Sequence, residues 1–231
     1  MTLTSALSNA LSGMSAASRS ADETASNISN AMTDGYRRRE VEVMARWQGS
    51  GGGVQIVGIQ RHVDQAVLQD RRGADAELAN IDAQTGFLSG VESEIGLPGE
   101  TGSLSDRLAK LDAALTTAIG RPESETRLDA VVDGLKDVTS HLGEISEHIQ
   151  SARARADKAI STDVALVNET LARVEDLNGK IRRHVTSGDD ISGLLDQRQE
   201  LVDTVAEIIP VRELDRGNGV IALMTPQGGL L

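Results

Sequence analysis

The sequence predicts a mainly α protein, an elongated antiparallel bundle of long helices with a small β-hairpin near each end. Apolar residues recur every three or four positions over most of the chain, which is the period of an amphipathic helix. Two short stretches alternate apolar and polar residues instead, as half-buried strands do. Aromatic residues make up only 1% of the 231 residues. Ala, Leu, Val and Ile must therefore supply the buried surface, which suits helix–helix seams.

The N-terminal segment predicts an amphipathic helix that ends near Thr33. Its apolar face consists of Leu3, Leu7, Leu11, Met14, Ala17, Ala21, Ala25, Ile28 and Met32. These positions lie three or four residues apart, so they fall on one side of a helix. The Asp34-Gly35 pair that follows is a strong turn signal and is expected to stop the helix.

A first hairpin is expected over residues 36–60. The residues from Tyr36 to Trp47 read as a strand, and Val54 to Ile59 form a second strand-like run. The glycine-rich stretch 49–53 between them predicts a flexible connector. It lacks the Lys-Ser/Thr pair of a phosphate-binding loop, and it joins two strands rather than a strand and a helix.

Helical periodicity returns at about His62. The pattern predicts one long helix from there to Ile95, with Gly86 as its candidate break point, and a shorter helix that Ser103 caps and that ends at Ile119. Two heptad seams follow. The first seam is Leu128, Val131, Leu135, Val138, Leu142, Ile145 and Ile149, and the second is Ala156, Ile160, Val164, Val167, Leu171, Val174, Asn178, Ile181 and Val185.

The C-terminal part predicts a last helix and a second hairpin. The helix covers residues 191–208, and Pro210 ends it. Residues 211–214 and 220–224 then look like strands around the polar turn 215–219.

Composition excludes several classes of function. The net charge of −12 argues against binding to nucleic acid or to an anionic membrane, since both require a basic patch. The absence of cysteine removes disulfides, Cys-ligated metals and thiol nucleophiles. The sequence has no run of about 18 consecutive apolar residues, so no transmembrane helix is expected. The N-terminus has no cleavable secretory signal. Its Ser/Thr/Asn-rich composition is compatible with an uncleaved type III export segment.

No pattern in the sequence predicts catalytic residues, a cofactor or a metal. His141 and His148 flank Glu144 and Glu147, but two helical turns, roughly 10 Å, separate the histidines, which is too far for two ligands of one ion. We therefore expect these side chains on a solvated polar face. A nucleophilic triad finds no support either, because the chain has no cysteine and no G-x-S-x-G elbow.

The stretch from Ser26 to Arg38 resembles the N-terminal signature of bacterial flagellar axial proteins, the rod, hook and hook-associated subunits. Their pattern is close to A-N-N-I-A-N-x-x-T-x-G-Y-x-R. The residues that match it are Asn27, Ile28, Asn30, Thr33, Gly35, Tyr36 and Arg38. Ser26 stands where the pattern has its first asparagine.

Two further stretches are similar to the hook-associated family of the hook–filament junction. One is the run of Leu194, Leu195, Asp196, Gln197, Arg198, Leu201 and Val202, which matches the family's L-L-D-Q-R-D-x-L-V. The other is the segment 53–64, similar to G-V-x-V-x-G-V-x-R-x-Y-D, with His62-Val63 in place of the usual pair before Asp64. The three matches follow the family's order and together cover most of the chain.

The resemblance implies a structural subunit of the bacterial flagellum at the hook–filament junction, secreted by the flagellar type III system and without an active site. The N-terminal helix would form the assembly interface through Leu3, Leu7, Leu11, Met14 and Ile28. The implied partners are further copies of the chain in a tube, the hook protein, the next hook-associated protein and the export apparatus, with no nucleic acid and no membrane.

The resemblance also suggests four segments: a core helix with the export segment (1–35), a hairpin connector (36–61), a helical bundle (62–209) and a C-terminal hairpin that begins an outer domain (210–231). Family members are usually longer and return through a C-terminal helix that pairs with the N-terminal one. The N-terminal apolar face is therefore expected to find no partner within this chain. We expect residues 1–30 to be mobile before assembly, because ordering each backbone residue costs about 1–2 kcal/mol.

Two other functions remain open from the sequence. Another flagellar axial subunit, of the rod or hook, would share the N-terminal turn but generally lacks the long heptad helices. The other is a cytosolic coiled-coil adaptor or signalling fragment, which the heptad seams by themselves would permit.

Overall fold

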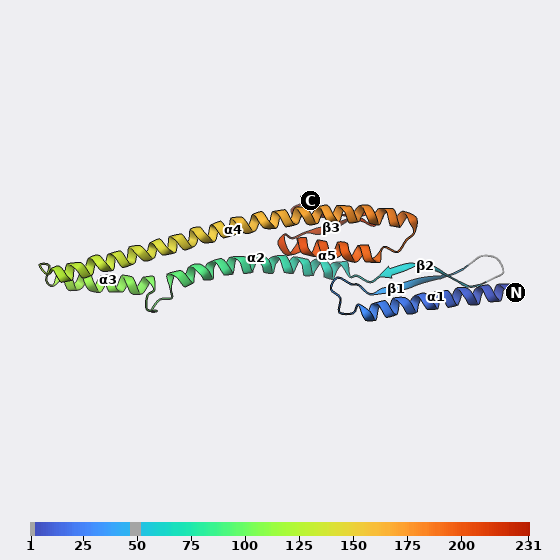
Figure 1. The fold of residues 1–231 in the computed structure, drawn as a ribbon, viewed down its shortest axis with the longest axis horizontal. Helices are drawn as coiled ribbons and strands as arrows, with labels where there is room; N and C mark the ends of the chain where they lie inside the picture. The colour runs from blue at the N-terminus through green and yellow to red at the C-terminus, as the bar shows by residue number, and fades with distance from the viewer. Residues whose placement is uncertain (1–2, 47–51) are drawn as a thin grey trace. The chain divides into compact units, whose positions relative to one another are not determined.

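The computed structural model describes residues 3–46 and 52–231, and within them it confirms a mainly α chain with small antiparallel hairpins (Figure 1). The chain divides into two compact units, residues 1–77 with 166–231 and residues 78–165. The four segments expected from the sequence stay a prediction about domain organisation.

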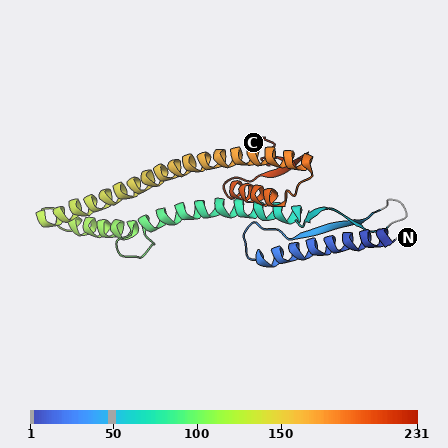
Figure 2. The ribbon, with the colours of Figure 1, turned by 45° about the vertical axis from the view of Figure 1, so that its right-hand side comes forward.

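The first unit begins with helix α1 (Leu3–Ser29) and the hairpin of β1 (Arg39–Ala45) and β2 (Val54–Arg61). The strands pair antiparallel, from Arg39 opposite Arg61 to Ala45 opposite Val54. Helix α1 lies along this hairpin in both views (Figures 1 and 2). The expected strand start at Tyr36 is wrong by three residues, because residues 30–38 form the turn that leads back along the helix. Trp47 and residues 49–51 of the expected connector lie outside the described residues.

The hairpin packs against the small, polar side of α1 rather than against its apolar side. The more buried positions of the helix are Ser5, Asn9, Ser12, Ala16, Glu23, Ser26 and Asn27. At 3.6 residues per turn they lie about half a turn from the leucines. The approach is close: a Cβ on Gly53, whose φ is 131°, would lie 2.9 Å from Ser12 Oγ, and Val54 N–H donates to that oxygen at 3.2 Å.

The core of the first unit lies where the C-terminal part of helix α4 (Glu125–Ser187) meets helix α5 (Ser192–Ile208) and the hairpin of β3 (Arg212–Gly217) and β4 (Val220–Met224). Its buried members are Val174, Val202, Val205, Ala206, Val211 and Leu223. This second hairpin confirms the expected antiparallel strand pair. The expected turn at 215–219 is too long, because β3 continues to Gly217 and only Asn218 and Gly219 form the turn. All six core side chains are aliphatic, as the shortage of aromatic residues predicts.

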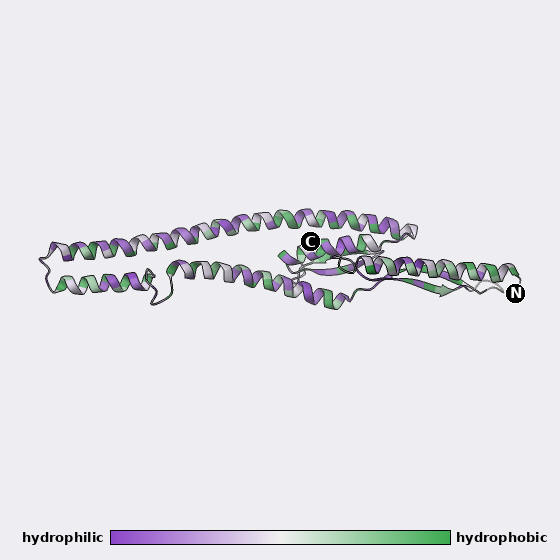
Figure 3. Ribbon diagram, turned by 60° about the horizontal axis from the view of Figure 1, so that its bottom comes forward, coloured by the Kyte–Doolittle hydropathy of each residue, from purple (hydrophilic) through white to green (hydrophobic). Residues whose placement is uncertain are grey.

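The second unit contains most of helix α2 (Gln65–Ile95), helix α3 (Leu104–Ile119) and the N-terminal part of α4. The Ser103 cap is confirmed, since its side chain accepts from Asp106 N–H. The expected break at Gly86 is absent, because a single glycine costs a helix only about 1 kcal/mol and α2 continues on both sides of it. The two heptad seams join into one 63-residue helix, along which Figure 3 shows hydrophobic and hydrophilic residues in alternation.

The buried side of α4 in this unit follows the expected seam only in part. Val138, His141 and Ile145 are buried, whereas Leu135 and Leu142 are about half exposed. Gly134 lies against Leu111 of α3, since a Cβ there would be 3.3 Å from Leu111 Cδ1. The glycine lets α3 approach next to the predicted seam, so His141 takes the place that Leu142 was expected to occupy. The expectation of a solvated His141 is therefore wrong.

Two glycines of α4 should respond in opposite ways to replacement by alanine. Nothing lies within 4 Å of a Cβ on Gly143, so Gly143→Ala should stabilise the protein by about 0.5–1 kcal/mol through helix propensity alone. Gly134→Ala should gain less or lose stability, because its Cβ would press on Leu111. Urea unfolding measures both changes, and a larger gain for Gly134→Ala would contradict this packing of α3 on α4.

Candidate functional site

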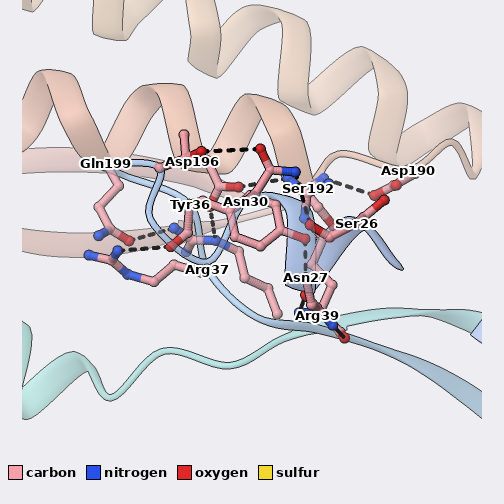
Figure 4. A network of polar contacts seen from close by, with 12 residues as sticks. Ser26, Asn27, Asn30, Tyr36, Arg37, Arg39, Asp190, Ser192, Asp196 and Gln199 are labelled. Atoms are coloured by element: carbon pink, nitrogen blue, oxygen red, sulfur yellow. Dashed lines mark hydrogen bonds and ion pairs between the residues drawn. The ribbon is translucent and has the colours of Figure 1, made fainter. Parts of the chain in front are cut away.

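A helical asparagine fixes the start of strand β1. Asn27 Oδ1 accepts hydrogen bonds from Arg39 N–H and from Tyr36 O–H, both at 2.9 Å, and Asn27 Nδ2 donates to the Arg39 carbonyl at 2.8 Å. The amide side chain thus satisfies both backbone groups of Arg39, as a neighbouring strand would. Figure 4 shows this contact, which ties the end of α1 to the hairpin.

The other residues of the axial motif shape the turn between α1 and β1. Asn30 Nδ2 donates to the Ser26 carbonyl at 2.9 Å, and Thr33 Oγ1 bonds Asn30 Oδ1 at 3.3 Å. Gly35 has a φ of 78°, a left-handed conformation that favours glycine. Arg38 stays exposed and pairs with Glu40 at 3.4 Å, and Ile28 is 73% exposed. The motif therefore divides into residues that build the turn and residues that remain accessible.

One carboxylate on α5 holds both strands of the first hairpin. Asp196 Oδ2 accepts from Arg39 Nη2 at 2.7 Å, and Asp196 Oδ1 accepts from Arg61 Nε at 2.6 Å. Arg39 and Arg61 face each other across the strands, so the three residues form a closed arrangement, here called the hairpin clamp. Gln199 Oε1 adds an acceptor for Arg61 Nη2 at 2.5 Å.

The clamp is partly shielded from water, with 11–17% of its side-chain surfaces exposed. Burial lowers the pKa of Arg39, but the hydrogen bond and the charge of Asp196 outweigh it, so the pKa lies above the usual value. Burial dominates at Arg61, and its pKa is lowered. The stack of Arg39 over the Tyr36 ring, at 4.8 Å from the ring centre, adds a cation–π contact.

Arg198 of the same run points to the other side of α5. Its Nη1 donates to Asn178 Oδ1 at 2.8 Å and to the Gly219 carbonyl at 2.5 Å. Asn178 of α4 in turn bonds the N–H and the carbonyl of Ile221 on β4, at 3.3 and 2.8 Å. Asn178 thus binds both backbone groups of one strand residue in the second hairpin, as Asn27 does for Arg39 in the first.

The remaining residues of the junction motif are structural or exposed. Val202 is fully buried in the core, while Leu194, Leu195 and Leu201 are half-buried. Gln197 is exposed. The motif therefore connects two sides: Asp196 holds the first hairpin, Arg198 holds the second, and Leu201 and Val202 pack in the core of the first unit.

A second ion-pair group, outside every sequence motif, fixes helix α2 to α5 and β3. Helix α5, the C-terminal part of α4 and the β3–β4 hairpin, which share one core, are here called the platform. Arg72 Nε pairs with Asp203 Oδ1 at 2.5 Å, and Arg72 Nη1 pairs with Glu213 Oε1 at 2.6 Å. Arg71 pairs with the other oxygen of Asp203. Charged residues are frequent throughout the chain, so no sequence pattern distinguishes Arg71, Arg72, Asp203 and Glu213. Only the fold brings these four side chains together.

The predicted assembly residues of α1 are exposed to solvent. Leu3 is 92% exposed, Leu7 60%, Leu11 58% and Met14 68%. Together with Ile28 they form the apolar stripe, on the side of α1 opposite the hairpin. A regular row of large apolar side chains held in water on a structured helix is characteristic of an interaction surface.

The histidines of α4 make local contacts. His141 Nδ1 lies 3.3 Å from Glu144 Oε2, and His148 Nδ1 lies 3.5 Å from Glu94 Oε2. Within residues 3–46 and 52–231, no three His, Cys, Asp or Glu side chains gather in a way that could hold a metal ion. The helices in these ranges are also too short or too polar to cross a membrane.

Loss of the clamp carboxylate should destabilise the first hairpin. Asp196→Asn leaves Arg39 and Arg61 without their shared counter-charge, at a cost of roughly 1.5–3 kcal/mol. The control is Glu40→Gln, whose carboxylate is 58% exposed and should contribute less than about 0.5 kcal/mol. Chemical denaturation measures both, and equal losses would contradict the special position of Asp196.

Removal of the Asn27 amide should expose the start of β1. Asn27→Ala leaves the N–H and carbonyl of Arg39 without their partner, and exchange of the Arg39 amide should accelerate at least about tenfold, the equivalent of 1.4 kcal/mol. Asn30→Ala serves as the control, because the Asn30 amide bonds only the end of its own helix and Ser29 and Thr33 beside it. Hydrogen exchange by NMR that is equally fast in both variants would refute the role of Asn27.

Comparison with known proteins agrees with these motifs. The flagellar hook-associated protein FlgK helical domain matches residues 88–231, and the flagella basal body rod protein family matches residues 7–37. Flagellar hook-associated protein 1 of Salmonella typhimurium is 25% identical over 235 residues, which cover 98% of this chain and 42% of that protein. Proteins of the same name from Escherichia coli and Bacillus subtilis are 24% and 25% identical, and the chain covers 42% and 46% of them.

The chain thus spans less than half the length of these curated relatives. The match to the helical domain covers more than half of the chain, and the rod-type match contains the turn that Asn27 and Gly35 build. On this evidence the chain belongs to the family of flagellar hook-associated proteins that carry the FlgK helical domain.

Proposed function

We propose that this chain is the N-terminal portion of a structural subunit at the junction between the flagellar hook and filament. In this proposal it is secreted by the flagellar type III apparatus and assembles through α1, with other copies of itself in a tube. The hook protein and the next hook-associated protein are its lateral partners. Its role is mechanical rather than enzymatic.

The apolar stripe of α1 is the observation that carries this proposal. The hairpin occupies the polar side of the helix, so the leucines remain available to another chain. Each Leu or Met that a partner covers fully would contribute roughly 1.5–3 kcal/mol, enough for several of them to order a contact between subunits.

The hairpin clamp gives the stripe a defined attachment. Asn27 ties α1 to β1, and Asp196 ties β1 and β2 to α5, which shares its core with α4 and the second hairpin. Force applied to α1 would therefore reach the helical platform through hydrogen bonds and ion pairs rather than through a loose linker. A subunit that joins two mechanically different tubes needs such a connection.

The alternative functions receive less support. A rod or hook subunit would account for the match at residues 7–37 but not for the match at residues 88–231. A function as a cytosolic coiled-coil adaptor would not explain the axial motif or the turn that its residues form.

Charged substitutions on the stripe should block assembly but not folding. Leu7→Asp with Leu11→Asp, introduced in the gene that encodes this chain, should leave the subunit folded and secreted but abolish filament attachment and swimming. Ser8→Asp is the matched control, because Ser8 is exposed on the same helix and lies about a third of a turn from the stripe.

Electron microscopy of hooks and a motility assay give the readout, and immunodetection in the medium tests secretion. Normal filaments on cells with the double variant would refute assembly through α1. Loss of filaments with Ser8→Asp as well would show that any charge on the helix interferes, which would also remove support for the stripe.

A further inference from the structure

A cavity of about 380 Å³ opens in the first unit beside the hairpin clamp. Strand β2, helices α2 and α5 and the β3–β4 hairpin each contribute to its wall. Three guanidinium groups line it, those of Arg61, Arg72 and Arg198, together with the two carboxylates of Glu213 and Asp215. No contact of the proposed assembly surface uses this cavity, and its existence does not depend on the flagellar role.

Two side chains that line the cavity carry a donor without an acceptor. Arg72 Nη2 and Gln199 Nε2 are buried donors with no hydrogen-bond partner, and both residues are at least 95% buried. A buried donor without an acceptor costs about 1–3 kcal/mol. Both residues line the same cavity, Arg72 from α2 and Gln199 from α5, so this cavity is the place where an acceptor for them would be expected.

The charges of the wall are unequally compensated. Asp196 neutralises Arg61, and Asp203 and Glu213 neutralise Arg72. Arg198 differs, because the oxygens that it bonds, on Asn178 and Gly219, are neutral. Across the described residues no carboxylate lies within ion-pair distance of Arg198. Burial lowers its pKa, although the charges of Glu213 and Asp215 act in the opposite direction.

We propose that this cavity binds a small oxyanion, a phosphate or a carboxylate, beside Arg198. The planar guanidinium fits such a group with two parallel N–H···O bonds. Gln65 and Gln69 of α2 lie at the wall with exposed amides and can donate to the outer oxygens of the ligand. The bound anion supplies the direct ion-pair partner that Arg198 lacks among the described residues.

The test measures the thermal unfolding midpoint of the whole chain against rising inorganic phosphate, with sodium chloride adjusted to constant ionic strength. A ligand that binds only the folded state raises the midpoint in a saturable way. A parallel series with acetate separates a phosphate site from a carboxylate site. A saturable rise with either anion supports the proposal, and calorimetric titration should give the same dissociation constant.

Gln69→Glu tests the location, because it places a carboxylate in the cavity wall without removing a contact of the core. It should weaken anion binding at least tenfold, and Gln65→Glu should act in the same direction. Gln55→Glu is the matched control, since Gln55 is exposed near the other end of β2 and should leave binding unchanged. No saturable rise in the unsubstituted chain, or equal binding by Gln69→Glu and Gln55→Glu, would overturn the proposal.

Discussion

The Asp196 carboxylate accepts one hydrogen bond from each strand of the first hairpin, and this pair of contacts links the hairpin on which α1 packs to helix α5. Arg39 and Arg61 occupy the last register positions of the two strands, so a single anion fixes the base of the hairpin. The backbone of Arg39 is held at the same time by Asn27. Arg39 therefore joins the N-terminal helix to α5, through its main chain on one side and its side chain on the other. Arg19 of α1 adds a longer ion pair, 3.9 Å from Asp190.

Each hairpin in the described chain is attached by the same two devices, a helical asparagine on the strand backbone and an arginine reaching a neighbouring element. Asn27 with Arg39 serves the first hairpin, and Asn178 with Arg198 serves the second. Small two-stranded sheets are marginal by themselves. The polar contacts compensate for the small apolar area that such short strands can bury, and they fix direction more strictly than apolar packing would.

Periodicity predicted most of the helices and both hairpins, because those patterns depend on neighbours within one element. It could not predict which helix face meets which partner. The leucines of α1 suggested a face without a partner in this chain, and they are indeed exposed, but the hairpin on the opposite polar face was unexpected. The displaced seam at His141 has a similar origin, since Gly134 determines where α3 approaches. Asn178 occupies a heptad position of the expected seam, and nothing in that pattern indicates a contact with a strand. Its hydrogen bond to Ile221 joins residues 43 positions apart in the sequence.

The most direct test of this account is a double-mutant cycle between the two contacts of Arg39. Asn27→Ala and Asp196→Asn are made singly and together, and the free energy of unfolding is measured for all four proteins. Because both contacts act on one residue, the account predicts a coupling energy above about 0.5 kcal/mol, with the double variant less destabilised than the sum of the two single variants. Strict additivity within about 0.3 kcal/mol would show that the two contacts act independently. It would contradict the claim that Arg39 joins α1 to the platform.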